Sequence, residues 1–171
     1  MRLKEKHPNA IVAGISPNLA SMESVRKAFK ETSEKYGCVG ILVNNAGISE
    51  NTSFMDYAEE TFDKVIDLNI KGVFNATRVA TECMVARGKG VILSTSSMVS
   101  ISGQPSGVVY PASKFAVNGL TVSLLSATAL IESFFKKPVK SRSGRHRRLE
   151  NNPRYFVQIL HVNIDDIGDA I

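Results

Sequence analysis

Residues 90–114 read GVILSTSSMVSISGQPSGVVYPASK, and this stretch decides the fold. Its residues 91–93 (Val-Ile-Leu) form a short apolar run that is typical of a strand buried in a parallel sheet. A serine-rich turn follows the strand, and helical spacing predicts a helix from Tyr110 to about residue 129. A buried strand, a polar turn and a helix in this order predict one unit of a parallel α/β sheet.

The same alternation of strand and helix extends toward the N-terminus. Apolar runs with β-branched residues predict strands at residues 10–15 and 38–43. The second run is almost uniformly apolar, so we expect that strand to be buried on both faces of the sheet. A further short strand is predicted after Tyr155.

Helices are predicted between these strands. One begins at Ser21 as N-cap, with Ser24 as a weaker alternative, and ends at Gly37. Apolar residues recur at helical spacing over residues 59–69 and 71–87, which predicts one long helix or two abutting helices. With all-apolar strands and short connections, the chain is predicted to form a partial Rossmann-like α/β fold, a doubly wound parallel sheet with helices on both faces.

Length and composition are those of one domain. The 171 residues are 43% hydrophobic, enough for one sizeable core. The charged N-terminal residues are not followed by an apolar stretch long enough for a signal peptide or a membrane span, so we expect no membrane association. Cys38 and Cys83 provide neither a disulfide framework nor the paired spacing of a metal site. The sequence therefore predicts no bound metal, a buried core role for Cys83, and a reduced, cytoplasmic setting.

The net charge of +5 comes from one segment. Without the seven cations of residues 136–148 the net charge would become −2; these are Lys136, Lys137, Lys140, Arg142, Arg145, Arg147 and Arg148. The cluster has no aromatic residues between its charges, and a charge run is usually a solvated segment. We therefore expect a loop or a disordered stretch over residues 136–153, and nucleic-acid binding is the weakest of the functions considered.

Three side chains within residues 97–114 suggest proton-transfer chemistry. Ser97 follows the buried strand, where ligands sit in a doubly wound sheet. Tyr110 and Lys114 are four residues apart, so they share a helix face. A phenol transfers protons poorly at neutral pH unless a nearby cation stabilises its phenolate, and Lys114 would be that cation. Such a pair taken alone is more often a solvated surface pair.

Additional motifs make the catalytic interpretation much stronger. Residues 44–48 read Asn-Asn-Ala-Gly-Ile, residues 67–74 read Asp-Leu-Asn-Ile-Lys-Gly-Val-Phe, and Ser97 precedes a Tyr-x-x-x-Lys pattern. Together, in this order, they resemble the short-chain dehydrogenase/reductase family over about residues 9–123. Within the family the sequence is most similar to 3-oxoacyl-carrier-protein reductases and bacterial hydroxysteroid dehydrogenases.

The resemblance implies an oxidoreductase that uses NAD or NADP, with no preference readable, and a small carbonyl or alcohol substrate. It implies that Tyr110 is the general acid/base, that Ser97 orients the substrate, and that Lys114 lowers the pKa of the tyrosine and binds the nicotinamide ribose. Asn69 would complete a proton relay through water to Lys114. The cofactor would contact Asn18, Leu19, Asn45, Ala46, Gly47, Tyr110 and Lys114. The helices over residues 71–87 and 110–129 resemble those that pair in family dimers, so a homo-oligomer is expected.

Two departures from the family pattern also carry expectations. The glycine-rich turn that seats the cofactor pyrophosphate in the family is not found in this sequence, so we expect that the first βαβ unit is missing and that the gene product is truncated. The domain is predicted over residues 1–130, followed by a divergent basic segment over residues 131–171. Three functions remain open: an oxidoreductase, an inactive remnant that associates with relatives, and the weakly supported nucleic-acid-binding segment.

Overall fold

The structure, a computed structural model, describes residues 6–135 and 155–161, with side chains described as far as residue 125. Its sheet has three parallel strands in the order β1 (Ile41–Asn44), β2 (Gly90–Ser96) and β3 (Tyr155–His161). In the register, Ile41 pairs with Val91 and Gly90 pairs with Tyr155. The predicted parallel α/β class is therefore confirmed, and so is the strand that the sequence predicts after Tyr155.

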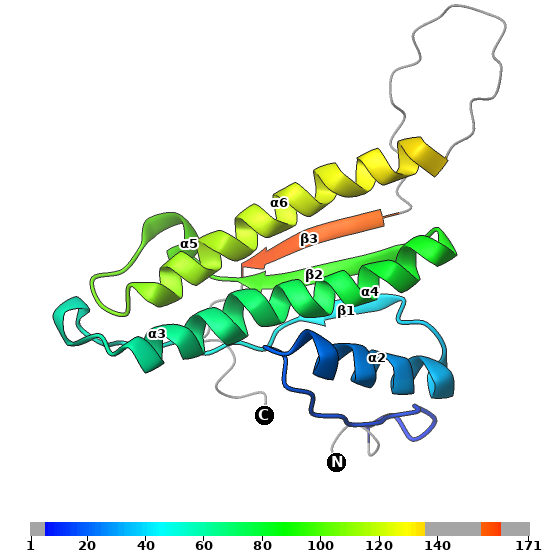
Figure 1. Cartoon of the computed structure of the whole chain (residues 1–171), viewed down its shortest axis with the longest axis horizontal. Helices are drawn as coiled ribbons and strands as arrows, with labels where there is room; N and C mark the ends of the chain where they lie inside the picture. The colour runs from blue at the N-terminus through cyan, green and yellow to red at the C-terminus, as the bar shows by residue number, and fades with distance from the viewer. Residues whose placement is uncertain (1–5, 136–154, 162–171) are drawn as a thin grey trace, which may run out of the picture.

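The helices form a layer against this sheet (Figure 1). They are α2 (Met22–Tyr36), α3 (Glu59–Ile66), α4 (Val73–Arg87), α5 (Val99–Ser102) and α6 (Val109–Phe135), with a 3-10 turn η1 (Phe54–Asp56) and a π-helical turn η2 (Asp67–Gly72). Helix α4 connects β1 to β2, and α6 connects β2 to β3. Both connections step across the sheet in the same direction, and right-handed crossovers of this kind place their helices on the same face. Helix α2 packs on α4, and α6 packs on η2, so the long helices in the described part of the chain cover one face of the sheet. The prediction placed helices on both faces.

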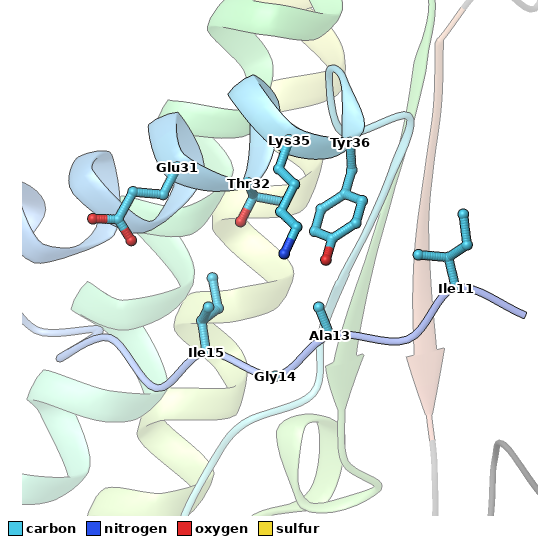
Figure 2. A pocket seen from close by; sticks show the side chains of 8 residues that line it. All are labelled: Ile11, Ala13, Gly14, Ile15, Glu31, Thr32, Lys35 and Tyr36. Carbon is cyan, nitrogen blue, oxygen red and sulfur yellow. The ribbon is translucent and has the colours of Figure 1, made fainter.

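The predicted strand over residues 10–15 is wrong. These residues have no regular structure and run past the last turns of α2, and Figure 2 shows the hollow of about 420 Å³ between them. Ile11 is 84% exposed and Ile15 is 55% exposed. A strand exists only through ladder hydrogen bonds to a neighbour, and within the described ranges this segment has no strand beside it.

The strand predicted over residues 38–43 exists as β1, but it is not buried on both faces. Leu42 and Asn44 face the helices, whereas Ile41 is 65% exposed and Val43 is 53% exposed. β1 is an edge strand in the described sheet, and its second face is not covered by any described helix. The apolar run predicted a strand correctly, but whether each face of that strand is buried depends on elements far away in the sequence.

Local chemistry defines both ends of α2 as predicted. The Ser21 hydroxyl accepts a hydrogen bond from the Ser24 backbone N–H at 3.2 Å, so Ser21 is the N-cap and the alternative cap Ser24 lies inside the helix. Gly37 ends the helix with a φ of 85°, a backbone conformation that glycine adopts without steric cost.

Residues 59–87 form one continuous helical run, which confirms the first of the two predicted alternatives. Within the run lies η2, whose wider turn contains Asn69. Asn69 is only 1% exposed. Single π-turns inside α-helices occur frequently at functional sites, because they redirect one side chain out of the regular helical positions.

The core lies between α4 and β2. Ala80 and Met84 of α4 pack on Ile92 of β2, and the half-buried Phe29, Val39, Leu42 and Leu124 surround them. This cluster joins α2, β1 and α6 to the central helix and strand.

The two cysteines lie together and Cys83 is only partly buried, whereas the sequence predicts no disulfide framework and a buried core role for Cys83. Cys38 in the turn between α2 and β1 is bonded to Cys83 of α4, and their Cα atoms are 6.1 Å apart. The prediction was wrong because the two residues are 45 positions apart in sequence, and only the packing of α4 beside β1 brings them into range.

The basic cluster of residues 136–148 lies outside the described residues, so the loop predicted there is not addressed by the structure. Helix α6 continues to Phe135, beyond its predicted end near residue 129. Among the described residues, no helix is both long and apolar enough to span a membrane.

The core predicts a large cost for one substitution. Met84 is 2% exposed, so Met84→Ala should lower the free energy of unfolding by about 2–5 kcal/mol through lost apolar burial and a residual cavity. Urea unfolding followed by circular dichroism measures this loss. The matched control is Met55→Ala, because Met55 is 87% exposed and should change stability little. Equal losses in the two variants would contradict this account of the core.

Candidate active site

Tyr110 and Lys114 occupy the first two turns of α6, and the structure buries both. Each is 5% exposed, which excludes the solvated surface pair that is the more common arrangement at this spacing. The Lys114 Nζ lies 5.6 Å from the centroid of the Tyr110 ring. Nζ also donates a hydrogen bond to the backbone carbonyl of Thr95 at 3.0 Å, so β2 determines the position of the ammonium group.

The Tyr110 hydroxyl is buried and has no hydrogen-bond partner in the described part of the chain. The Tyr57 hydroxyl and Glu50 Oε1 are also buried without a partner, but these two residues are neighbours of each other. Burial, and then the Glu50 carboxylate, raise the pKa of Tyr57 above its ordinary value. Buried polar atoms are almost always hydrogen-bonded, and an exception needs a reason. A reacting group that bonds to a substrate atom is such a reason for Tyr110.

Burial also shifts the pKa of Lys114. It lowers the pKa of the Lys114 ammonium below its ordinary value, because a cation removed from water loses solvation. The Lys114 ammonium is thus a desolvated cation beside the Tyr110 ring.

Ser97 stands directly after β2, and the turn that holds it is clamped to α6. Ser96 Oγ donates to Asn118 Oδ1 at 2.7 Å, and Asn118 Nδ2 donates to Ser100 Oγ at 2.9 Å. The Ser100 hydroxyl in turn donates to the backbone carbonyl of Ser97 at 2.6 Å. Ser96 and Ser100 are 1% and 0% exposed, so this is a buried, fully bonded network that fixes the Ser97 backbone relative to the helix of Tyr110 and Lys114.

Asn69 connects the turn after β1 to α6. Its Oδ1 accepts from the Ile48 backbone N–H at 2.9 Å, and its Nδ2 donates to the Ile48 carbonyl at 2.8 Å and to Ser113 Oγ at 3.0 Å. A Cβ built on Gly47 would lie 3.2 Å from Asn69 Oδ1 and 3.6 Å from Lys114 Nζ. Asn69, Gly47 and Lys114 therefore meet at one point.

Five of the seven predicted cofactor contacts lie on two neighbouring segments, and the other two are Tyr110 and Lys114. Leu19, Asn45 and Ala46 line one cavity of about 140 Å³, together with residues of β1, η2 and α4. Asn18 uses its Oδ1 to accept from the Ala20 backbone N–H at 3.0 Å, and Asn45 Oδ1 accepts from Thr95 Oγ1 at 2.9 Å. Gly47 lies at the Lys114 end, so the segments extend from a small cavity to the buried acid–base pair.

Two observations indicate that these residues can hold a dinucleotide. A Cβ on Gly47 would make a tight contact with Asn69 Oδ1 and an ordinary contact with Lys114 Nζ, so glycine avoids crowding here, and its bare backbone permits close approach of a ligand. An ammonium group has three donors, and the described hydrogen bond of Lys114 to Thr95 uses one of them. The others could bind ribose hydroxyls.

Sequence reasoning missed the residues that hold the site in place. Ser113, which is 0% exposed, bonds both Asn69 and the Tyr110 carbonyl. The Asn75 amide donates to the Leu19 carbonyl at 2.8 Å and is 4% exposed. Asn118 holds the serine turn. A polar side chain one helical turn from a candidate catalytic residue is the signal that would have indicated Ser113 and Asn118.

Comparison with known proteins gives consistent results. The profile of the family described as short chain dehydrogenase matches residues 2–130. A 3alpha-hydroxysteroid dehydrogenase of Mediterraneibacter gnavus is 54% identical over 123 residues, which are 72% of this chain and 49% of that protein. A 3-oxoacyl-[acyl-carrier-protein] reductase of Staphylococcus aureus is 40% identical over 109 residues, 64% of this chain and 44% of that protein. The chain thus spans about half the length of these curated relatives.

Solved structures agree with the sequence comparison. A gluconate 5-dehydrogenase from Burkholderia cenocepacia, crystallised in complex with NADP and tartrate, superimposes with a TM-score of 0.64 at 32% identity. The match covers 66% of this chain and 44% of that chain.

The buried lysine predicts a pH dependence of stability. Since the pKa of Lys114 in the folded chain is below the 10.5 of an exposed lysine, the unfolded chain binds an additional proton between these two values. The free energy of unfolding therefore rises with pH in that window through Lys114. Lys114→Met should abolish this increment, so its stability relative to the unmodified chain should fall as pH approaches 10.5.

Urea unfolding from neutral pH to about pH 10 measures this difference. Lys71→Met is the control, because Lys71 is a half-exposed lysine paired with Asp67 on η2. A stability difference for Lys114→Met that stays constant with pH, as expected for the control, would contradict the assignment of a depressed pKa to Lys114.

Proposed function

Since this chain belongs to the short-chain dehydrogenase family, we propose that it forms the catalytic part of an NAD(P)-dependent oxidoreductase acting on a carbonyl or secondary alcohol. The observation that carries the proposal is the buried Tyr110 hydroxyl, which has no hydrogen-bond partner in the described structure and whose ring lies 5.6 Å from the Lys114 Nζ. A proton donor held in this way is available only to a molecule that enters the site.

In the proposed reduction, bound NADH or NADPH supplies the hydride to the carbonyl carbon. The carbonyl oxygen gains negative charge, and the Tyr110 hydroxyl donates its proton to that oxygen, which gives the alcohol. Ser97 Oγ holds the same oxygen by a hydrogen bond beside Tyr110. The Lys114 ammonium stabilises the phenolate that Tyr110 becomes.

Asn69 is proposed as the link between this pair and the solvent. Hydrogen bonds to Ile48 and Ser113 hold its amide. Its Oδ1 and the Lys114 Nζ both lie close to Gly47. A water molecule bound there would return a proton to Tyr110 through Lys114. Leu19, Asn45 and Ala46 would hold the adenosine half of the cofactor, with no observation that favours NAD over NADP.

The substrate proposal starts from the relatives. A relative at 54% identity is a 3alpha-hydroxysteroid dehydrogenase, and one at 40% is a 3-oxoacyl-[acyl-carrier-protein] reductase. We therefore expect a steroid ketone or its alcohol to be accepted in preference to a 3-oxoacyl thioester. The competing proposal is an inactive remnant of the family, and the two are separated by whether any turnover depends on Tyr110.

The proposed function predicts how removal of the Tyr110 hydroxyl changes the rate of carbonyl reduction. Tyr110→Phe keeps the ring and removes the proposed proton donor, so carbonyl reduction by the protein that contains this chain should fall at least about 100-fold. Oxidation of NADH and NADPH at 340 nm, with a steroid ketone and with a 3-oxoacyl thioester, measures the rate. The control Tyr36→Phe changes an exposed tyrosine at the end of α2 and should leave the rate unchanged. Turnover that survives in Tyr110→Phe would refute the assignment, and no turnover in the unmodified protein would favour the remnant.

We also propose that the protein is a homo-oligomer. Large aromatic side chains are half exposed on three helices: Phe62 of α3 at 46%, Phe74 of α4 at 48% and Phe115 of α6 at 50%. Exposed apolar groups that gather on neighbouring helices are typical of an interface, and a two-fold axis would bury the same surface on both copies.

This surface predicts the response to one added charge. Phe115→Lys should convert the oligomer to monomers, because a dimer would bury two uncompensated cations. Light scattering coupled to size-exclusion chromatography measures the mass. Met55→Lys, at an exposed position on η1, is the matched control and should leave the assembly intact. A monomeric unmodified protein, or an assembly that tolerates Phe115→Lys, would remove the proposal.

A further inference from the structure

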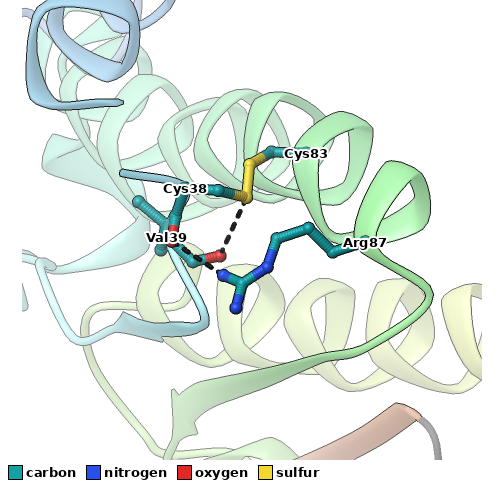
Figure 3. The surroundings of a disulfide bond; sticks show 4 residues. All are labelled: Cys38, Val39, Cys83 and Arg87. Carbon is teal, nitrogen blue, oxygen red and sulfur yellow. Dashed lines mark hydrogen bonds between the residues drawn. A yellow bond between two sulfur atoms is a disulfide. The ribbon is translucent and has the colours of Figure 1, made fainter. Parts of the chain in front are cut away.

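The bonded pair of cysteines plays no part in the proposed reaction. Cys38 lies in the turn that connects α2 to β1, and Cys83 lies in the third turn of α4 (Figure 3). Their Cα separation of 6.1 Å is within the range of protein disulfides, so the backbone holds the two residues at bonding distance without rearrangement. Both side chains are only partly buried.

A small molecule can approach the pair. Cys83 lines a hollow of about 370 Å³ between α2 and α4, whose other lining residues are Arg26, Phe29, Lys30, Ser33, Val79 and Glu82. On the other side, the Arg87 guanidinium donates to the Cys38 carbonyl at 3.0 Å. The surroundings of the pair thus contain several cations and open to solvent, unlike those of a cysteine in an apolar core.

We propose that Cys38 and Cys83 form a reversible thiol-oxidation site for low-molecular-weight disulfides. In the forward direction one thiolate attacks such a disulfide, a mixed disulfide forms and one small thiol leaves. The second cysteine then attacks the mixed disulfide, which releases the second small thiol and leaves the Cys38–Cys83 bond. Two protein thiols are oxidised and one small disulfide is reduced to two thiols. In a reducing compartment, disulfides of this kind are usually transient and redox-sensing.

The cross-link has a structural consequence that its surroundings define. It closes a segment of 45 residues that includes β1, Gly47 and Asn69, and it fastens the end of α2 to α4. Besides the disulfide, the described ion pair between these helices is Arg26–Glu82 at 2.7 Å, whose side chains are 47% and 37% exposed. Such exposed pairs contribute little to stability, so the reduced chain should hold α2 less firmly.

The experiment uses the 171-residue chain itself, with glutathione disulfide as the oxidant. The reduced chain is incubated with the oxidant, alkylated with iodoacetamide and analysed by intact mass and by a non-reducing peptide map. We expect a monomer that has lost two hydrogens, takes up no iodoacetamide and yields one cross-linked peptide with Cys38 and Cys83. Stable glutathione adducts, or two alkylated thiols, would overturn the proposal.

Thermal unfolding tests the structural consequence. The oxidised chain should have a Tm about 5–10 °C above the reduced chain, as expected for a cross-link of this loop length. The doubly substituted chain Cys38→Ser/Cys83→Ser is the control, and its Tm should not respond to the oxidant. A Tm that is equal in the oxidised and reduced chains would show that the bond does not fasten α2. Neither measurement depends on catalytic activity, so failure here is distinguishable from failure of the proposed function.

Discussion

The contact between α6 and the turn after β2 determines the geometry of the candidate site. Lys114 bonds the Thr95 carbonyl, and Asn118 bonds Ser96 and Ser100. These polar groups are buried or nearly so, and an unpaired buried donor or acceptor costs about 1–3 kcal/mol, so α6 cannot slide or rotate against β2 without losing several bonds at once. Tyr110, on the same helix, is therefore held in a fixed relation to Ser97. Hydrophobic packing alone, which is not directional, would leave that relation loose.

A second constraint connects the first half of the chain to this contact. The π-turn η2 directs Asn69 toward Ile48 and Ser113, and the absent side chain of Gly47 lets the backbone pass between Asn69 and Lys114. Asn75 similarly holds the backbone of Leu19. Side-chain amides thus bond backbone carbonyls at each junction between the cofactor segments and the helices. Amides suit this role because they donate and accept without carrying a charge into the interior.

The features that could be predicted from sequence are those with a local cause. The cap at Ser21, the end at Gly37 and the apolar period of α4 depend on neighbours within a few residues, and all three are found in the structure. The candidate site residues were found because their spacing along the chain is characteristic, and the structure brings Tyr110, Lys114, Asn69 and Gly47 together. Residues 10–15 have the composition of a strand, but strand formation requires a partner, which no local pattern supplies. The burial of Ser113 and the packing role of Asn118 were missed for a related reason, since a polar residue in a helix is predicted to be exposed until its packing face is known.

The contacts that hold Ser97 and Lys114 lie on the helix-covered face of the sheet. The described hydrogen bonds that hold the Ser97 backbone, Lys114 and the neighbouring Asn69 are made among β2, α5, α6, η2 and the turn after β1. The exposed face of β1, with Ile41 and Val43, takes no part in these contacts. Within the described residues, the buried Tyr110 and Lys114 therefore belong to the helix-covered face of the sheet. The depressed pKa of Lys114 and the burial of Tyr110 can therefore be measured in the chain before any cofactor is added.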